Sequence, residues 1–508
     1  MADRWQDLNQ QAIECMQNGK IDKAIGYGLE ALEAARSEYG DKHESVAVSL
    51  NNMGELHRLE GNYPEAESVL LQSADVSEAL HGKQSLEVGE TLMNLAELYF
   101  SQQRFDDAEP LMERVIAVYQ EQSSDEPSLM ASVYNTCGSM YLGAGRMEPA
   151  RDLFEKAQTV VEEHKSDEAP ELGPILKSLA VIDRQTGDLE GAEKKLRRAL
   201  VIYENSISPE HPEFAGILTH LAEVYFAKGY LQAAEPLLKQ GIDIYKNSLD
   251  EKSPETGMAL DRLATLYAAT GRIDQAEPMF QEVIDIFKSS LGSGHPALAE
   301  TQNTLAEMYI DKGQFDDAFE LLEASLQARE KSLGSKHPAV AQSLNNLAIV
   351  QDRRGNRTLA LKQHKRALEI REEVFGPDHP AITQSLDNMA AIYRVQGKAV
   401  EAEQLLKKSL EIWRKNHGDK HPAAAQSYHH LATLYFDSGK YEEAEQALLS
   451  AKKILETDKD ANQMHLAIVF ETFAALYHKM DRTLESKEYA ARGLKIRKPE
   501  QMAKPSVH

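Results

Sequence analysis

Apolar and small residues recur along this chain with the spacing of amphipathic helices. Leu50, Met53 and Gly54 lie at positions i, i+3 and i+4, on one face of a helix. Gly61 follows, and glycine tolerates the left-handed backbone that commonly ends a helix. The helical spacing then starts again at Ala66. The pattern therefore predicts two helices joined by a short turn.

This helix–turn–helix unit returns every 42 residues. Glycine marks the turn at Gly19, Gly61, Gly145, Gly187, Gly229, Gly271, Gly313, Gly355, Gly397 and Gly439. Two further turn positions hold Gln103 and Asp481. Alanine or glycine stands seven residues before the turn in all twelve frames, which lets paired helices approach closely. A fixed period of this size predicts a stack in which each unit buries its apolar face against its neighbours.

The repeats also set the expected domain organisation. We expect helices throughout residues 5–497 and no strands, because the helical spacing persists through consecutive segments. The stack is predicted to be one continuous domain over residues 1–497, with turn positions at 19, 61, 103 and onwards to 481. Residues 498–508 are expected to form a short disordered tail.

Composition narrows the class of protein and of partner. Hydrophobic residues make up 42% of the chain and aromatic residues only 7%, which favours helices packed through Leu, Ala, Ile and Met over a β-sandwich. The formal charge of −25 disfavours nucleic acid and anionic membranes as partners. Cys15 and Cys137 are the only cysteines, so a reducing compartment is favoured over a disulfide framework. With no run of 18 apolar residues and no secretory signal at the start, we expect a cytoplasmic protein that does not insert into membranes.

Histidine occupies a recurrent place in the loops between repeats. Several of these loops read Gly-x-x-His-Pro, as at residues 292–296 and 334–338. Proline suits the first position of a helix. The histidines in this frame are His43, His211, His295, His337, His379 and His421. Each lies a whole repeat from the next, so we expect a structural role at the helix start and no shared metal ion.

The motifs Leu-Asn-Asn-Leu-Ala at 344–348 and Leu-Ala-Glu-Met-Tyr-x-x-x-Gly at 305–313, followed by Ala318, resemble tetratricopeptide repeats. The resemblance runs from Gln6 to about Lys495. It implies an all-α fold, a right-handed α-solenoid of about twelve 42-residue repeats. HEAT and armadillo repeats have a similar period but lack this Ala–Tyr–Gly–Ala spacing.

The 42-residue length, the His-Pro loop and the Asn-Asn-Leu-Ala helix are similar to the repeats of kinesin light chains and nephrocystin-3. Kinesin light chains carry a heptad coiled coil before their repeats, whereas this chain begins almost directly with its first repeat. A role attached to a kinesin motor is therefore not expected.

The resemblance implies that the first helix of each repeat lines a concave groove that binds ligand. Rotation by about 100° per residue, with Leu344, Leu347 and Ala348 buried, turns residues 342, 345, 346, 349 and 352 away from the second helix. Asparagine is frequent at such positions, and its amide can hold the backbone of an extended ligand. The candidate partner-binding residues are Asn51, Asn52, Asn94, Asn135, Glu300, Asn303, Glu307, Asn345, Asn346, Asp387, Asn388 and Arg394. A solvated polar helix face is the alternative interpretation.

Acidic residues outnumber basic residues on this predicted face by ten to five, so we expect a protein or peptide partner that is neutral to basic. The ends of the stack also offer surfaces for self-association.

The sequence contains no motif for catalysis. Phosphate-binding loops, Gly-x-Ser-x-Gly, His-Glu-x-x-His and Cys-x-x-Cys do not occur. His429 and His430 are adjacent on a helix, so their side chains point about 100° apart and should not chelate one ion together. We therefore expect no enzyme activity, no metal and no cofactor. The sequence predicts a scaffold or adaptor that binds an extended segment of a partner protein. The alternative is a regulatory repeat protein that senses a peptide or a small effector.

Overall fold

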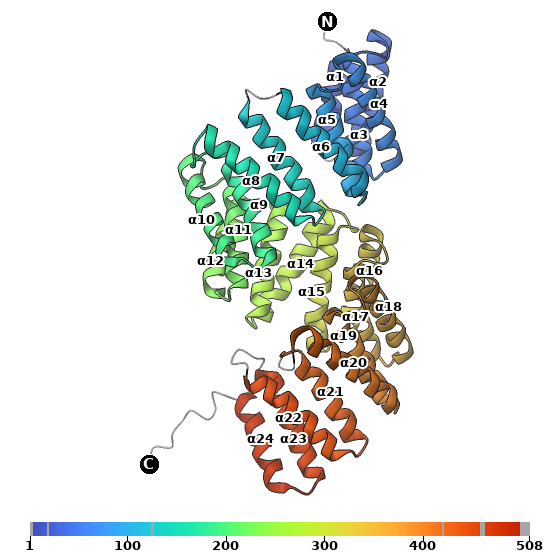
Figure 1. Cartoon of the computed structure of the whole chain (residues 1–508), viewed down its shortest axis with the longest axis vertical. Helices are drawn as coiled ribbons and strands as arrows, with labels where there is room; N and C mark the ends of the chain where they lie inside the picture. The colour runs from blue at the N-terminus through green and yellow to red at the C-terminus, as the bar shows by residue number, and fades with distance from the viewer. Residues whose placement is uncertain (1–3, 18–19, 123–125, 419–420, 458–462, 498–508) are drawn as a thin grey trace. The chain divides into compact units, whose positions relative to one another are not determined.

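A computed structural model describes residues 4–17, 20–122, 126–418, 421–457 and 463–497. The chain divides into two compact units, Met1–Glu251 and Lys252–His508, which are described one at a time. Over the described residues the structure has twenty-four α-helices, one short 3-10 helix and no strand (Figure 1). This confirms the predicted all-α class. The prediction of one continuous domain over residues 1–497 stays a prediction.

Unit 1 is built from consecutive helical pairs. Its helices are α1 (Arg4–Gln17), α2 (Ile21–Tyr39), α3 (Glu44–Glu60), α4 (Tyr63–His81), α5 (Leu86–Ser101), α6 (Phe105–Gln122), α7 (Pro127–Gly143), α8 (Met147–His164), α9 (Leu172–Thr186), α10 (Leu189–Ser206), α11 (Pro212–Ala227) and α12 (Leu231–Ser248). Odd-numbered helices are the first helices of the predicted repeats, and even-numbered helices are the second.

Unit 2 continues the same alternation. Its helices are α13 (Pro254–Ala269), α14 (Ile273–Ser290), α15 (Pro296–Lys312), α16 (Phe315–Leu333), α17 (Pro338–Arg353), α18 (Arg357–Phe375), η1 (Pro380–Ile382), α19 (Thr383–Val395), α20 (Ala399–His417), α21 (Ala424–Asp437), α22 (Tyr441–Thr457), α23 (Gln463–Lys479) and α24 (Thr483–Arg497).

The described turns inside the repeats keep a left-handed backbone even where glycine is absent. Gly61 has φ 86°, and Gln103 and Asp481 both have φ 59°. Among the described residues these two are the non-glycine residues with positive φ. The conformation is therefore set by the position in the repeat. The predicted turn at Gly19 and the predicted tail at 498–508 lie outside the described residues.

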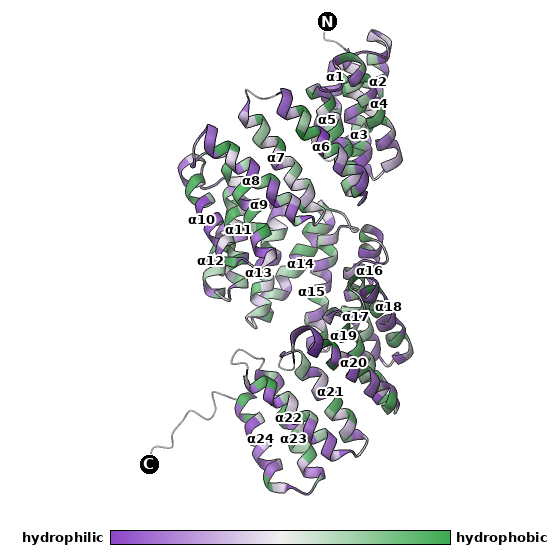
Figure 2. Cartoon of the chain, viewed as in Figure 1, coloured by the Kyte–Doolittle hydropathy of each residue, from purple (hydrophilic) through white to green (hydrophobic). Residues whose placement is uncertain are grey.

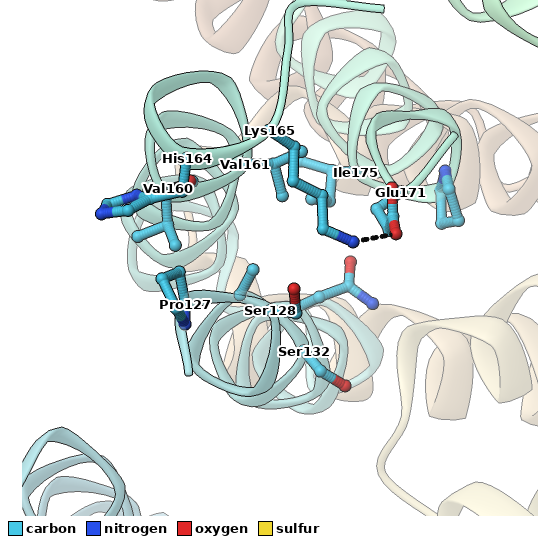
Figure 3. Close-up of a pocket in the computed structure, with 12 residues that line it drawn as sticks. Pro127, Ser128, Ser132, Val160, Val161, His164, Lys165, Glu171 and Ile175 are labelled. Carbon is cyan, nitrogen blue, oxygen red and sulfur yellow. Dashed lines mark hydrogen bonds and ion pairs between the residues drawn. The ribbon is translucent and has the colours of Figure 1, made fainter. Parts of the chain in front are cut away.

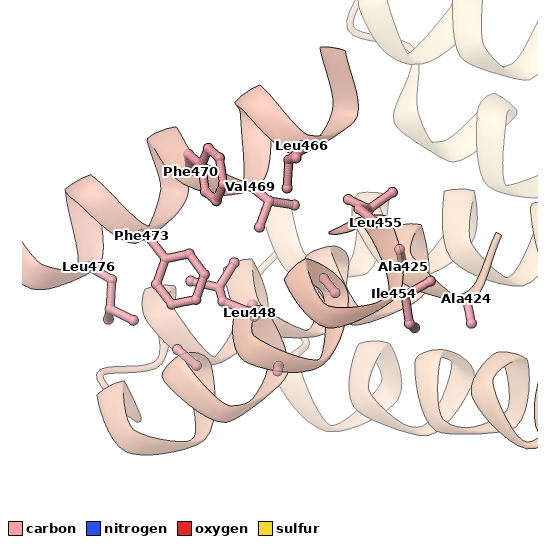
Figure 4. Packing of buried hydrophobic residues seen from close by; sticks show 14 of the residues in the cluster. Ala424, Ala425, Leu448, Ile454, Leu455, Leu466, Val469, Phe470, Phe473 and Leu476 are labelled. Atoms are coloured by element: carbon pink, nitrogen blue, oxygen red, sulfur yellow. The ribbon is translucent and has the colours of Figure 1, made fainter. Parts of the chain in front are cut away.

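Small residues let the two helices of a repeat pack closely. The second helices carry an alanine with 0% exposure at Ala24, Ala66, Ala108, Ala150, Ala192, Ala234, Ala276, Ala318, Ala360, Ala402 and Ala444. Apolar and polar residues alternate around each helix, so that green and purple bands follow one another in Figure 2. In the last repeats of unit 2, Phe470 and Phe473 of α23 pack with Leu448 of α22 (Figure 4). The predicted amphipathic pattern thus builds the core.

The loop histidines bond to the backbone at or near helix starts: His43, His211, His295 and His337 cap α-helices, His379 caps η1, and His421 lies three residues before α21 begins. In each case ring Nδ1 accepts the backbone N–H two residues later, as Ala339 donates to His337 over 3.2 Å and Ala297 to His295 over 3.2 Å. The other four pairs are Ser45 to His43, Glu213 to His211, Ala381 to His379 and Ala423 to His421. The bond satisfies a backbone donor that a helix start leaves open. This confirms the structural role predicted for these histidines.

A recurrent polar contact joins several neighbouring repeats. In it, a tyrosine of a first helix donates a hydrogen bond to a glutamate of the preceding second helix, and we call this contact the polar clasp. Tyr99 in α5 donates its hydroxyl to Glu67 in α4 over 2.8 Å, and Arg104 pairs with the same carboxylate over 2.8 Å. Other tyrosine–glutamate pairs in this arrangement are Tyr225–Glu193, Tyr309–Glu277, Tyr435–Glu403 and Tyr477–Glu445.

The clasp between α8 and α9 is reversed. Here the preceding second helix supplies Arg151, which pairs with Asp183 of the next first helix over 2.7 Å. Lys195 also contacts Asp183, over 2.5 Å, and this carboxylate is 1% exposed.

Candidate functional site

Polar side chains of the first helices bond to one another from repeat to repeat. We call them the polar ladder, which consists of Asn51, Asn52 and Asn94 in unit 1 and of Asn303, Glu307, Asn345, Asn346 and Asp387 in unit 2. In unit 1, Asn94 donates to Asn51 over 3.0 Å, and Asn52 donates to Asn9 over 2.9 Å. Each bond joins helices that lie one repeat apart in the sequence.

In unit 2 one carboxylate accepts hydrogen bonds from two asparagines. Asn303 in α15 and Asn346 in α17 donate to Glu307 Oε1 over 2.9 and 2.7 Å. Asn346 also donates to Asn303 over 3.3 Å. Asn303 and Asn346 are buried, at 2% and 7% exposure, whereas Glu307 is exposed. The ladder therefore presents Glu307 at the surface and keeps both amides beneath it.

Asp387 is buried, although helix rotation alone places it on the polar face. Ser427 of the next first helix, α21, donates to Asp387 Oδ2 over 2.6 Å, and the side chain is 5% exposed. Burial raises the pKa of Asp387 to about 6. Rotation within one helix omits the neighbouring repeat, which covers this position.

The side chain of Asn345 also points in a different direction from the one predicted. The sequence turns it away from the second helix, but its amide lies 2.7 Å from His364 Nδ1 in α18. Ser385 in α19 also contacts it over 3.2 Å, and Asn345 is 1% exposed. The buried His364 of the second helix forms a hydrogen bond with Asn345, and this contact holds the asparagine in the core.

The remaining candidates have varied surroundings. Glu300 is exposed, and Asn388 is half-buried. Arg394 forms an ion pair with Asp437. Asn135 has a buried Oδ1 without a hydrogen-bond partner. Whether any of the twelve candidates binds a partner stays a prediction.

An exposed row of glutamines runs beside the ladder in unit 2. Gln342, Gln384 and Gln426 lie 42 residues apart on or beside α17, α19 and α21, and all three are exposed. We call this row the glutamine column. Position 342 belongs to the face predicted from helix rotation, but glutamine is not among the predicted binding residues, which are mainly asparagines. The recurrence of glutamine in three consecutive frames is the signal that identifies the column.

Two buried arginines lie close to the column. Arg329 in α16 donates to the Ala339 carbonyl and to Ser343, while Arg371 in α18 donates to Ser385 and Gln384. They are 4% and 8% exposed, and burial lowers the pKa of each. Aligning the repeats reveals them, because the frames on either side hold the aromatic residues Phe287 and Trp413.

Among the described residues, the histidines of the last repeats form no chelating group. His429 Nε2 lies 2.9 Å from Thr472 Oγ1, and burial lowers the pKa of both His429 and His430 to about 4. Within the described ranges, no set of three His, Cys, Asp or Glu side chains is arranged to hold a metal ion. None of the helices in those ranges has the length and apolar character needed to cross a bilayer.

Paired helices of fixed period, left-handed turns and hydrogen bonds between successive first helices define an α-helical repeat protein. The model of the tetratricopeptide repeat family matches residues 8–79, 45–121, 87–163, 171–247, 213–289, 297–373 and 380–457. The chain belongs to the tetratricopeptide repeat family, whose fold generally serves as a non-enzymatic interaction scaffold.

Several solved structures are similar to this chain. A putative kinesin light chain from Podosopora anserina with nearly identical TPR-like repeats is 29% identical, with 41% of this chain and 99% of that chain covered and a TM-score of 0.37. BtubC from P. vanneervenii is 21% identical over 49% of this chain and 95% of its own, with a TM-score of 0.38. A Rap protein complexed with Competence and Sporulation Factor is 14% identical over 73% of this chain and 99% of its own, with a TM-score of 0.51, a likeness of fold. No curated protein matches the chain.

Proposed function

We propose that this protein is a non-catalytic scaffold or adaptor that binds an extended segment of a partner protein along the polar ladder and the glutamine column. The observation that carries the proposal is the regular row of polar side chains on successive first helices. The exposed amides of Gln342, Gln384 and Gln426, at one position in three consecutive repeats, can donate to and accept from the peptide groups of an extended chain, whatever its side chains are.

The charges beside the column favour a neutral to basic segment. Glu300 and Glu307 are exposed on α15, while Arg329 and Arg371 are buried. Two exposed carboxylates attract a cationic segment, and such attraction weakens as salt concentration rises.

The test compares the partners captured by three forms of the intact chain. The column variant carries Gln342→Ala, Gln384→Ala and Gln426→Ala. Each lost hydrogen bond contributes about 0.5–1.5 kcal/mol, so three together should weaken binding at least about tenfold. The measurement is affinity capture with quantitative mass spectrometry, followed by titration calorimetry with the proteins identified.

The matched control also replaces three exposed glutamines, but on second helices: Gln327→Ala in α16, Gln404→Ala in α20 and Gln446→Ala in α22. We expect the control to retain wild-type partners and wild-type affinity. Equal binding by all three forms would remove the column from the binding surface. Circular dichroism checks that every variant keeps its helix content.

A further inference from the structure

A cavity of about 190 Å³ opens in unit 1 between α7, α8 and α9 (Figure 3). Ala131 of α7, Val161 of α8 and Ile175 of α9 contribute apolar walls. The ion pair between Lys165 and Glu171 lies at the cavity, as the dashed line in Figure 3 shows. Both of these side chains are exposed, so the cavity has a charged, solvent-accessible edge.

The cavity lies where the neighbouring repeats place an aromatic ring. Val161 lies 42 residues after Tyr119 and 42 residues before Tyr203. Each tyrosine packs against a glycine of its own first helix. A methyl group added at Gly89 would lie 2.8 Å from the Tyr119 ring, and one at Gly173 would lie 2.2 Å from the Tyr203 ring. In both neighbouring repeats, therefore, a ring occupies the space above a glycine.

The repeat formed by α7 and α8 lacks this glycine–tyrosine pair. Ala131 stands in the frame of the two glycines, and Val161 stands in the frame of the two tyrosines. The extra methyl of Ala131 is smaller than the ring that Val161 lacks, which accounts for the open space. A dry apolar cavity of about 150 Å³ holds benzene in another protein. The cavity of about 190 Å³ therefore has room for one six-membered ring.

One polar side chain in the cavity wall carries an atom without a hydrogen-bond partner. Asn135 lines the cavity, and its Oδ1 is buried without a hydrogen bond. A buried acceptor left unpaired costs about 1–3 kcal/mol, which a donor on a ligand would recover. Benzene alone has no such donor, whereas a ring that carries a hydroxyl does.

We propose that this cavity binds a phenol-like group, a neutral six-membered ring whose hydroxyl donates to Asn135 Oδ1. The bound ring takes the place of the tyrosine side chain that the repeats on either side supply for themselves. A free phenolic compound and a tyrosine side chain in a peptide share this chemistry. The proposal does not depend on partner binding along the glutamine column, since phenol itself is the probe.

The first experiment measures binding of phenol and of toluene to the intact chain by saturation-transfer NMR and competition. Toluene has nearly the same size and shape but no donor. We expect phenol to bind at least about tenfold more tightly, because one hydrogen bond to an otherwise unpaired acceptor separates the two. Equal affinities, or no binding of phenol, would overturn the proposal.

Variants then locate the site. Val161→Tyr combined with Ala131→Gly restores the pair found in both neighbouring repeats, so it should abolish phenol binding and raise the melting temperature. Ala131→Leu fills the cavity in a second way and should also abolish binding, which keeps the test valid if the double variant folds poorly. Asn135→Leu should remove the preference for phenol over toluene. Wild-type phenol binding by both filled variants contradicts the proposal.

A matched control and a second probe complete the test. Thr159→Ala on α8 is exposed and lies outside the cavity lining, so it should leave phenol binding unchanged. The capped tripeptide Ala-Tyr-Ala distinguishes the two sources of the ring. If it binds at least as tightly as phenol, and loses binding in both filled variants, the occupant is a tyrosine side chain. If only phenol binds, the occupant is a free small molecule.

Discussion

His364 shows how one residue can make the stability of a repeat depend on pH. Leu322 and Leu406 occupy the same frame one repeat before and after it, and His364 is 1% exposed. Burial, and then the charge of Arg371, lower its pKa to about 4. The unfolded histidine keeps a pKa of about 6.5, so acid protonates the unfolded chain first. Its contribution to stability is therefore present above pH 6.5 and is lost as the pH falls towards 4.

His364→Leu should make unfolding less sensitive to acid. The difference between a pKa of 6.5 and one of about 4 corresponds to about 3 kcal/mol. Between pH 7 and pH 4, the free energy of unfolding of the wild type should therefore fall by about 3 kcal/mol more than that of the variant. Urea titrations at several pH values measure this. The exposed His478, changed to leucine, serves as the control, and superimposable profiles for wild type and His364→Leu would contradict the assignment.

At the scale of elements, five of the six loop histidines act as helix caps. His337 accepts the Ala339 N–H through a neutral ring nitrogen, and burial followed by the charge of Arg329 lowers its pKa. A neutral ring is required, because protonated Nδ1 cannot accept a hydrogen bond. The capping bond is thus present above the unfolded pKa and is lost in acid.

His337→Ala removes this cap and should lower the free energy of unfolding by about 1 kcal/mol at pH 7. His337→Asn should recover most of the loss, since asparagine is a strong N-cap residue. Chemical denaturation of the full chain provides the measurement. A His337→Asn protein no more stable than His337→Ala would show that the side chain acts through packing instead.

The turns without glycine are local weak points. A left-handed backbone at Gln103 (φ 59°) strains a residue that carries a Cβ. Gln103→Gly should therefore raise the free energy of unfolding by about 1 kcal/mol, and Gly313→Ala, at φ 76°, should lower it by a similar amount. If Gln103→Gly destabilises the chain, the turn is held by contacts of the glutamine side chain.

At the scale of the whole molecule, coupling passes from each repeat to its neighbours. Ala306 of α15 is 0% exposed, so Ala306→Asp buries an unpaired carboxylate. The substitution should cost about 3–5 kcal/mol. Hydrogen exchange with mass spectrometry should show lost protection in α15 and α16 and retained protection in unit 1, because the solenoid is coupled between nearest neighbours. Uniform loss across every helix would contradict this one-dimensional account.

The sequence predicted the helices and turns well because both follow from local spacing. The turn at Gln103 could be placed without glycine, since the 42-residue period fixes it. Burial of Asn345 and Asp387 could not be predicted from one helix, because residues of the next repeat cover them. The buried, unpaired oxygen of Asn135 could not be predicted either, because the burial of a single atom depends on how neighbouring helices pack. Aligning the frames beforehand reveals such exceptions, but their contacts require the structure.

The reversed clasp bears on how nearly identical repeats avoid misassembly. A chain of similar units can fold with one unit docked against the wrong neighbour, a known failure of repeat proteins. In most of the polar clasps, a carboxylate of the preceding second helix contacts a tyrosine. In the clasp between α8 and α9, the guanidinium of Arg151 contacts the buried Asp183 instead. Skipping a repeat at this boundary would place Glu109, which stands 42 residues before Arg151, opposite Asp183 and would leave only Lys195 to pair with it. One inverted charge pair thus marks a unique position in an otherwise periodic sequence and makes out-of-register folds costly.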